Sequence, residues 1–405
     1  MVNFAPLNTN IKVLGIGGAG GNILGFLSQS NINGLKLSYI DSDANNLAAS
    51  TLSDKHLIGK NVTRGLSTGG NPDIGRKIAQ EDMPLLRKLI EGVDLLIVVV
   101  GLGGGLSSGL APLLVKEAKR QGSLVFCFAC LPFTLEGKQK HEAANNALLE
   151  LRVESGAVIL LPNDLLLQEL EPTATVLEAF QAASQWVLRG VKALLSVIRQ
   201  TGMINIDFAT LKNVFAEPGG KTLYGLGQGE GENFLQKALD DLSLCPMLFV
   251  PQQTRQAERL LVNIIGGKNL TLGDINKALA TLAGKFCSKE STIIGAVIDP
   301  NKKDYVDICV MGKASARAPK KSATKGVISR DDKKSTPKEL PVYPYPLQQQ
   351  ELNLESEVDY SELSFLIDHN KPENRGLFDE TEQNLFNGED LDVPTYLRRG
   401  IKIRL

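Results

Sequence analysis

The feature that most constrains this chain is a series of short apolar runs between residues 11 and 162, with helical stretches between them. The runs "IKVLGI", "LKLSYI", "LLIVVV", "LVFCFAC" and "VILLP" are continuous instead of alternating. Strands buried on both faces have this pattern, and they are typical of parallel sheets covered by helices on both sides. We expect helices from Gly21, Asp73 and Leu110 between the strands. The sequence therefore predicts an α/β fold with a Rossmann-like, doubly wound parallel sheet.

Two glycine-rich loops follow strands of this sheet and precede helices. They are "GIGGAGGN" at Gly15 to Asn22 and "GLGGGLSSG" at Gly101 to Gly109, and a third, "GLSTGGNP", spans 65–72. Glycine costs about 0.5–1 kcal/mol relative to alanine inside regular structure, so a cluster of it needs a reason. Bare amides at a helix N-terminus bind anions, and ligands of parallel sheets lie at the carboxyl ends of strands. One loop alone could be only a tight turn, but two on one edge predict a phosphate site.

The same letters allow a second interpretation. Gly15, Gly17 and Gly20 satisfy G-x-G-x-x-G, and Asp41 and Asp43 follow the second strand as possible ribose partners, so a dinucleotide-dependent dehydrogenase remains an alternative. Such an enzyme does not need a second phosphate loop, and no histidine, tyrosine or lysine is an evident acid for hydride transfer. Neither loop is a P-loop, so backbone amides must hold the phosphates.

Composition excludes several classes. The 405 residues are 43% hydrophobic with a net charge of −1, which fits two or three domains and gives no sign of a nucleic-acid partner. Cys127 and Cys130 lie three apart on a strand, so they should face opposite sides as core residues. The three histidines have no metal-like spacing. No signal-like start and no run of about 20 apolar residues is present, so we expect a cytoplasmic protein without a membrane span.

The second half predicts a different architecture. A wide apolar stripe over Thr175 to Gln200 predicts one long helix. After it, short strands and helices near 232–242 and 272–286 predict a smaller α+β domain. Beyond Gly312 the chain is rich in Lys, Ser and Pro and then acidic, which is typical of disorder. The expected divisions are a nucleotide-binding domain 1–174, a central helix 175–202, an α+β domain 203–312, a disordered linker 313–390 and a terminal peptide 391–405.

Taken together, these stretches resemble the bacterial cell-division family FtsZ of the tubulin superfamily. Its signature, written GGGTGTG, is similar to "GGGLSSG" at Gly103 to Gly109. Further stretches match in order: "GIGGAGGN", "NPDIGR", "PFTLEGKQK", "PND", "NIDFA" and "IDP". The resemblance implies a GTPase domain in which GTP or GDP lies over the sheet edge, with Mg²⁺ as a candidate companion of the nucleotide. The next subunit of a head-to-tail filament then completes the active site.

The resemblance also implies roles for single residues. Those expected to line the phosphates or lie close to them are Gly18, Gly20, Gly21, Ala44, Asn71, Gly103, Gly104, Gly105, Leu106, Ser107, Ser108 and Gly109. Those expected near ribose and base are Asn22, Glu136, Lys140, Asn163, Phe180, Ser184 and Gln185. Asp207, with Asn205, would enter the neighbour's site to orient water or a cation. A helix cap is an alternative role for Asp207, and the two roles can coexist.

Four departures from the family pattern bear on activity. Thr210 stands where the family has a second carboxylate, so hydrolysis should be impaired. Leu106 replaces a threonine of the signature, and Lys140 stands where arginine is common. Ser184 and Gln185 replace the pair whose aspartate reads guanine, which puts guanine specificity in question. The hypotheses are a slow GTPase that forms filaments, a non-hydrolysing relative that joins filaments of an active partner, and the dehydrogenase.

The end of the chain, "LDVPTYLRRGIKIRL", resembles the family's terminal peptide, which binds membrane-tethering adaptors at the division site. Leu391, Asp392, Pro394, Tyr396, Leu397 and Arg398 are its expected contact residues. A short apolar face with arginines beside it is typical of a motif that orders on binding.

Overall fold

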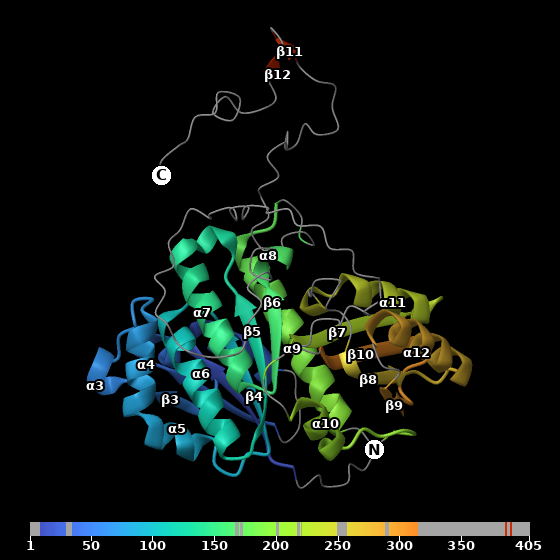
Figure 1. The fold of residues 1–405 in the computed structure, drawn as a ribbon, viewed down its shortest axis with the longest axis horizontal. Helices are drawn as coiled ribbons and strands as arrows, with labels where there is room; N and C mark the ends of the chain where they lie inside the picture. The colour runs from blue at the N-terminus through green and yellow to red at the C-terminus, as the bar shows by residue number, and fades with distance from the viewer. Residues whose placement is uncertain are drawn as a thin grey trace, which may run out of the picture. The chain divides into compact units, whose positions relative to one another are not determined.

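The computed structural model describes residues 9–29, 35–166, 170, 173–199, 202–216, 219, 221–248, 257–287, 291–314, 385–386 and 389–390. They fall into two units, Met1–Ala323 and Thr324–Leu405. The first unit contains two sheets joined by a long helix, and the second contains one short hairpin (Figure 1). In the described ranges no helix is long and apolar enough to cross a membrane.

The first sheet has six parallel strands in the order β3-β2-β1-β4-β5-β6. They are β1 (Ile11–Ile16), β2 (Lys36–Asp41), β3 (Lys55–Leu57), β4 (Leu95–Gly101), β5 (Leu124–Leu131) and β6 (Ala157–Pro162). The chain changes direction across the sheet between β1 and β4, and the crevice at such a switch point is where open α/β sheets bind ligands. The predicted parallel sheet is confirmed.

The helices of this half lie on both faces of the sheet (Figure 1). They are α1 (Gly17–Ser28), α2 (Ala44–Ala49), α3 (Lys60–Thr63), α4 (Pro72–Glu81), α5 (Met83–Leu89), α6 (Gly105–Arg120), α7 (Lys138–Glu154), α8 (Asn163–Leu166) and α9 (Val176–Arg199). Buried side chains of α1, α2 and α9 share one core cluster, and those of α4 to α7 share another. Cys127 and Cys130 belong to different clusters, so the expected division of this pair between the two faces is confirmed.

The second sheet has the order β7-β10-β8-β9, with β10 antiparallel to both neighbours and β8 parallel to β9. Its elements are α10 (Phe208–Phe215), β7 (Lys221–Glu230), α11 (Phe234–Leu244), β8 (Ala257–Gly266), α12 (Leu272–Phe286), β9 (Thr292–Ile298) and β10 (Tyr305–Ala314). Buried residues of this sheet, of α9 and of the first sheet form one continuous cluster. The long helix therefore packs into a core that both sheets share.

Two helix starts differ from the sequence prediction. Helix α1 begins at Gly17 instead of Gly21, and α6 begins at Gly105 instead of Leu110. The Ser108 amide already donates to the Gly104 carbonyl at 2.9 Å, which is an i→i−4 helical bond. Each glycine-rich stretch is therefore largely the first turn of its helix, and the loop before it is shorter than we expected.

The second unit contains β11 (Leu385–Phe386) and β12 (Glu389–Asp390), which pair antiparallel. This hairpin lies inside the segment 313–390 that we expected to be disordered, and residues 313–314 still belong to β10. Residues 387–388 between the two strands read Asn-Gly, a pair typical of two-residue hairpin turns. The terminal peptide residues 391–405, with all six expected contact residues, lie outside the described residues.

Candidate functional site

The two glycine-rich stretches meet at the switch point between β1 and β4. A Cβ built on Gly101, at the end of β4, would lie 2.6 Å from the Cβ of Ala19 in α1. A Cβ on Gly17 would lie 3.8 Å from the Cβ of Ser107 in α6. Because both helices begin here, the free amides of their first turns lie together at the switch point between β1 and β4, which we call the crevice.

The two serines of the second stretch hold that stretch in shape. The Ser107 hydroxyl donates to the carbonyl oxygens of Gly101 at 2.6 Å and Gly104 at 3.2 Å. The Ser108 hydroxyl accepts from the Gly103 amide at 2.9 Å, and Gly103 has a φ of +98°, which favours glycine. Only 5% of Ser107 and 1% of Ser108 is exposed. The main donors left to face an anion are the backbone amides at the start of α6.

Two further glycines of this stretch bring α4 against α6. A Cβ on Gly105 would lie 2.5 Å from the Asn71 amide nitrogen, and a Cβ on Gly109 would overlap the Pro72 carbonyl oxygen. The Asn71 side chain caps α4 by accepting from the Asp73 amide at 2.9 Å. Leu106 is 5% exposed and packs in the core, so its side chain does not line the crevice. This stretch therefore places Asn71 beside the start of α6.

The first stretch rests on a polar network that the sequence did not predict. A Cβ on Gly21 would overlap the buried Tyr39 ring, and one on Gly20 would lie 2.7 Å from the Val99 carbonyl oxygen. The Tyr39 hydroxyl donates to Asp41 at 2.6 Å. Burial and this bond to the carboxylate raise the pKa of Tyr39. The network fixes the end of β2 beneath the first turn of α1.

Asp41 is buried and already bonded to three protein donors. Its carboxylate accepts from Tyr39, from the Asn46 side chain at 3.0 Å and from the Asp43 amide at 3.2 Å, and only 3% of the residue is exposed. The Asp43 side chain is also engaged, because it caps α2 by accepting from the Asn45 amide at 2.9 Å. The ribose contacts expected of a dinucleotide-binding fold are therefore already occupied by protein donors.

Beside this network lies a pocket of about 270 Å³. Gly18, Gly21 and Asn22 of α1 line it, together with Asn46 at the start of α2. Ala44 is exposed nearby, and its amide donates to the Gly65 carbonyl at 3.0 Å. The third glycine-rich loop is thereby joined to the same edge of the sheet.

On the other side of the crevice, the ends of β5 and β6 supply charged and amide side chains. Glu136 accepts from the Phe133 amide at 2.9 Å and pairs with Lys140 at 2.9 Å. A Cβ on Gly103 would lie 2.9 Å from the Lys140 carbonyl oxygen, so this turn touches the second glycine-rich stretch. Asn163 is 5% exposed, and its Oδ1 has no hydrogen-bond partner among the described residues. A buried acceptor without a donor is costly, which marks Asn163 as ready for a ligand.

The first turns of α9 reach the same edge. The rings of Phe180 and Phe133 pack edge to face at 5.2 Å, and Phe180 is 42% exposed. The Ser184 hydroxyl donates to the Phe180 carbonyl at 2.8 Å and is nearly buried, whereas Gln185 is exposed. Of Ser184 and Gln185, which stand where the family reads guanine, only Gln185 is exposed.

Asp207 and Asn205 lie at the opposite edge of the sheet. Lys212 of α10 donates to the Gly122 carbonyl just before β5, so α10 lies beside the amino ends of the strands. Asp207 is the N-cap of α10 and accepts from the Thr210 amide at 2.6 Å, while Asn205 accepts from the Gly202 amide at 2.6 Å. The 24 residues of α9 lie between the two edges and span about 36 Å. The structure does not bring Asp207 to the glycine-rich crevice of its own chain.

A parallel sheet with facing glycine-rich helix starts, a long central helix and a second sheet defines a nucleotide-binding fold of the tubulin type. The family model described as "Tubulin/FtsZ family, GTPase domain" matches residues 10–171, and "FtsZ family, C-terminal domain" matches residues 220–314. The chain is 33% identical over 308 residues to a cell division protein FtsZ of Coxiella burnetii, covering 76% of this chain and 79% of that one.

Other relatives agree. A cell division protein FtsZ of Aquifex aeolicus is 31% identical over 301 residues, which cover 74% of this chain and 82% of that one. A solved structure described as "FtsZ dimer, empty (M. jannaschii)" superposes with a TM-score of 0.69 at 31% identity, covering 76% of this chain and 89% of that chain. The chain belongs to the FtsZ family.

Proposed function

We propose that this chain binds GTP at the crevice between β1 and β4 and polymerises head to tail into filaments for bacterial cell division. The observation that carries the proposal is the pairing of two glycine-rich helix starts, in the second of which both serine hydroxyls already bond within the stretch. Backbone amides are the main donors that face a ligand there, and amides at two helix N-termini suit a polyphosphate. Membership of the FtsZ family supports the same activity.

The proposed roles of the remaining site residues come from their positions around the crevice. Gly18, Gly20, Gly21, Gly104 and Gly105 offer backbone to the phosphates, while Lys140 adds a positive charge at the rim. Asn163 offers its unpaired Oδ1 to a donor on the nucleoside, and Phe180 offers an exposed ring to the base. Ala44, Asn71, Asn22 and Glu136 complete the rim.

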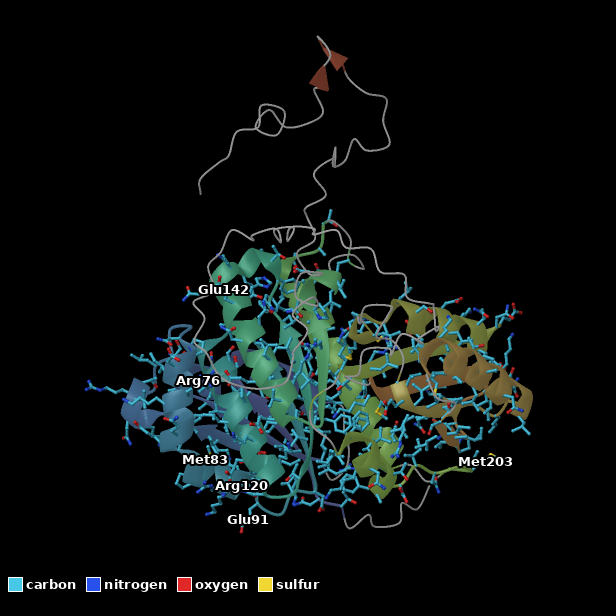
Figure 2. All side chains as sticks on the ribbon, viewed as in Figure 1. Arg76, Met83, Glu91, Arg120, Glu142 and Met203 are labelled. Atoms are coloured by element: carbon cyan, nitrogen blue, oxygen red, sulfur yellow. The ribbon has the colours of Figure 1, made fainter. Side chains whose placement is uncertain are left out.

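Assembly follows from the position of Asp207. Because α9, about 36 Å long, runs from the edge with the crevice to the edge with Asp207, Asp207 can meet a nucleotide only in another subunit. Exposed apolar side chains lie at both edges: Leu66, Leu135 and Leu177 in segments at the carboxyl edge, and Met203 and Ile204 just before Asp207. Figure 2 shows Met203 at the far end of the molecule from Glu142. Large apolar groups at both ends suit a stacked interface.

We propose that hydrolysis at this interface is slow. The family pattern has a carboxylate where this chain has Thr210, so one negative charge near the attacking water is missing. Asp207 remains the single acidic group of the segment 202–210. A carboxylate of this kind orients water or a cation against the terminal phosphate.

Base choice is a second open property of the site. The Ser184 hydroxyl donates to the Phe180 carbonyl. The Gln185 side chain is an amide that can present either a donor or an acceptor. We therefore expect weaker discrimination against other purines than a carboxylate would give. Magnesium would be held mainly by phosphates and water, since the described part of the chain has no cluster of three or more His, Cys, Asp or Glu.

The terminal peptide is proposed to determine where in the cell the filament is found. Leu391, Asp392, Pro394, Tyr396, Leu397 and Arg398 are proposed to bind a membrane-tethering adaptor, which would bring a cytoplasmic filament to the division site. The support is the sequence itself, which places apolar side chains beside arginines at the end of the chain. Deletion of 391–405 should abolish adaptor binding and leave nucleotide binding intact.

The test is to identify the bound nucleotide after gentle purification, and then to sediment the protein with GTP while phosphate is assayed. Bound guanine nucleotide, pelleted filaments and slow phosphate release are the expected result. Filaments, or co-sedimentation with an active relative, without phosphate would assign the non-hydrolysing role. Binding of NADH without filaments would contradict the proposal.

A further inference from the structure

Thr68, in the third glycine-rich loop, carries a hydroxyl that has no hydrogen-bond partner among the described residues. The residue is only 5% exposed. Its one hydrogen bond to another described residue is accepted by its backbone carbonyl, from the Asn71 amide at 3.1 Å. The neighbouring Ser67 hydroxyl, in contrast, is exposed and accepts from the Gly69 amide at 3.3 Å. A polar group without a partner in a nearly buried side chain is costly, which marks the Thr68 hydroxyl as ready for a ligand.

The Thr68 hydroxyl lies at the start of α6. A Cβ built on Gly105 would overlap Thr68 Oγ1, so this oxygen lies against the first residue of that helix. The Cα–Cβ bonds of a helix tilt toward its N-terminus, which puts the oxygen level with the free amides of the first turn. The hydroxyl therefore stands beside the backbone donors that face the crevice.

The turn that carries Thr68 is fixed by its backbone. Besides the bond between Thr68 and Asn71 that closes the turn, Gly69 and Gly70 at its centre have φ of +59° and +78°. Glycine adopts these left-handed conformations without strain, whereas other residues do not. The position of the hydroxyl is thus set by the fold before any ligand binds.

The order of the strands indicates which phosphate would meet Thr68. Asn163 and Phe180, which we propose to contact the nucleoside, follow β6 in the chain. The third loop is tied to the other side of the sheet, because the Gly65 carbonyl accepts from the Ala44 amide just after β2. Strands β2 and β6 lie on opposite sides of the switch point between β1 and β4. The terminal phosphate is the part of GTP farthest from the base, so it falls nearest to the third loop.

We propose that the Thr68 hydroxyl donates to the terminal phosphate of GTP and makes the crevice prefer GTP to GDP. The inference rests on the proposed function and deepens it. Leu106 has no hydroxyl where the family signature has a threonine, and the hydroxyls of Ser107 and Ser108 bond within their own stretch. Thr68 supplies from another loop the donor that this signature lacks. GDP has no third phosphate and gains nothing from the bond.

The test compares Thr68→Val, which removes the hydroxyl at nearly the same shape, with Thr68→Ser, which keeps it. Thr63→Val is the matched control, because the Thr63 hydroxyl already donates to the Gly59 carbonyl at 3.2 Å. Affinities for GDP and for a GTP analogue with an imido bridge are measured by calorimetry, at protein concentrations where sedimentation shows no filaments. We expect Thr68→Val to bind the analogue roughly 10- to 100-fold more weakly and GDP equally well. Thr68→Ser and the control should keep the parent's ratio of the two affinities.

Urea unfolding without nucleotide checks that each variant folds, and Thr68→Ala gives the same comparison should Thr68→Val be unfolded. An unchanged ratio in the variant without the hydroxyl would overturn the proposal. Equal weakening toward GDP and the analogue would also overturn it, because the hydroxyl would then shape the loop or meet an inner phosphate. A parent protein that binds neither guanine nucleotide would instead overturn the proposed function, and this inference with it.

Discussion

The crevice between β1 and β4 and the segment around Asp207 use polar side chains in opposite ways. At the crevice, Ser107, Ser108 and Asp41 are buried and bonded to protein. The side chains of Asn205 and Asp207 are exposed, and each accepts from a backbone amide three residues away. In the proposed function the crevice of one chain therefore holds the nucleotide mainly with backbone, whereas the exposed Asp207 acts in the site of another subunit.

The largest expected effect comes from changing Asp207 in the exposed segment. Asp207→Asn keeps an N-cap of similar quality but removes the negative charge. Phosphate release per filament subunit should fall by about 10²- to 10⁴-fold, the range for loss of a general base. Nucleotide binding should remain unchanged in a filter or fluorescence assay. Loss of nucleotide binding in this variant would mean that Asp207 acts within its own chain.

The next largest effect comes from changing Gly104 at the crevice. Gly104 is the N-cap of α6 with φ −78° and ψ 149°, a conformation that aspartate adopts readily. Gly104→Asp should satisfy the first amides of α6 with its own carboxylate and repel a phosphate. A Cβ at Gly104 would lie 2.9 Å from Ser107 Oγ, so this hydroxyl must shift slightly. We expect affinity for GTP to fall by about 100-fold or more, with thermal stability little changed because the new cap offsets this shift. Equal affinity in equilibrium dialysis would place the phosphates elsewhere.

A smaller effect separates glycines that packing requires from one that it does not. A Cβ at Gly105 would overlap Thr68 Oγ1 and lie 2.5 Å from the Asn71 amide nitrogen, whereas one at Gly25 in α1 meets nothing within 4 Å. Gly105→Ala should lower the free energy of unfolding by about 1–3 kcal/mol. Gly25→Ala should raise it by about 0.5–1 kcal/mol, as measured by urea unfolding.

The smallest effect concerns pH. Because the folded-state pKa of Asp207 is lowered by Thr210, its cap stabilises the fold above the ordinary aspartate pKa and is lost as the pH falls through the lowered value. Asp207→Ala should therefore cost about 1 kcal/mol at pH 7 and less at a pH below the lowered pKa. A cost that stays constant over this range would exclude an ionised cap.

Much of the first sheet was predictable because its strands are buried on both faces and read as continuous apolar runs. The bounds of α12 also match the range 272–286 that the sequence predicts. The short edge strand β3 and the early starts of α1 and α6 were not predicted, because glycine carries no periodicity and tertiary packing decides its conformation. The same limit hid the internal bonding of Ser107 and Ser108.

The network of Tyr39, Asp41 and Asn46 shows what a local pattern cannot give. Its residues come from β2 and α2, and they meet beneath α1 only because Gly21 leaves room for the ring. The sequence motif suggests that Asp41 binds a ribose, whereas in the structure its carboxylate accepts a hydrogen bond from Tyr39. Asn163 was found through resemblance, and its unpaired Oδ1 became visible only in the packed structure.

The most direct test of the account mixes two inactive subunits. In a filament of Gly104→Asp and Asp207→Asn chains, some interfaces join an intact crevice of the second variant to an intact Asp207 of the first. The account predicts that each variant alone releases almost no phosphate and that the mixture regains a substantial fraction of the parent rate while both co-sediment. Co-sedimentation without any regained phosphate release would contradict a site shared between neighbouring subunits.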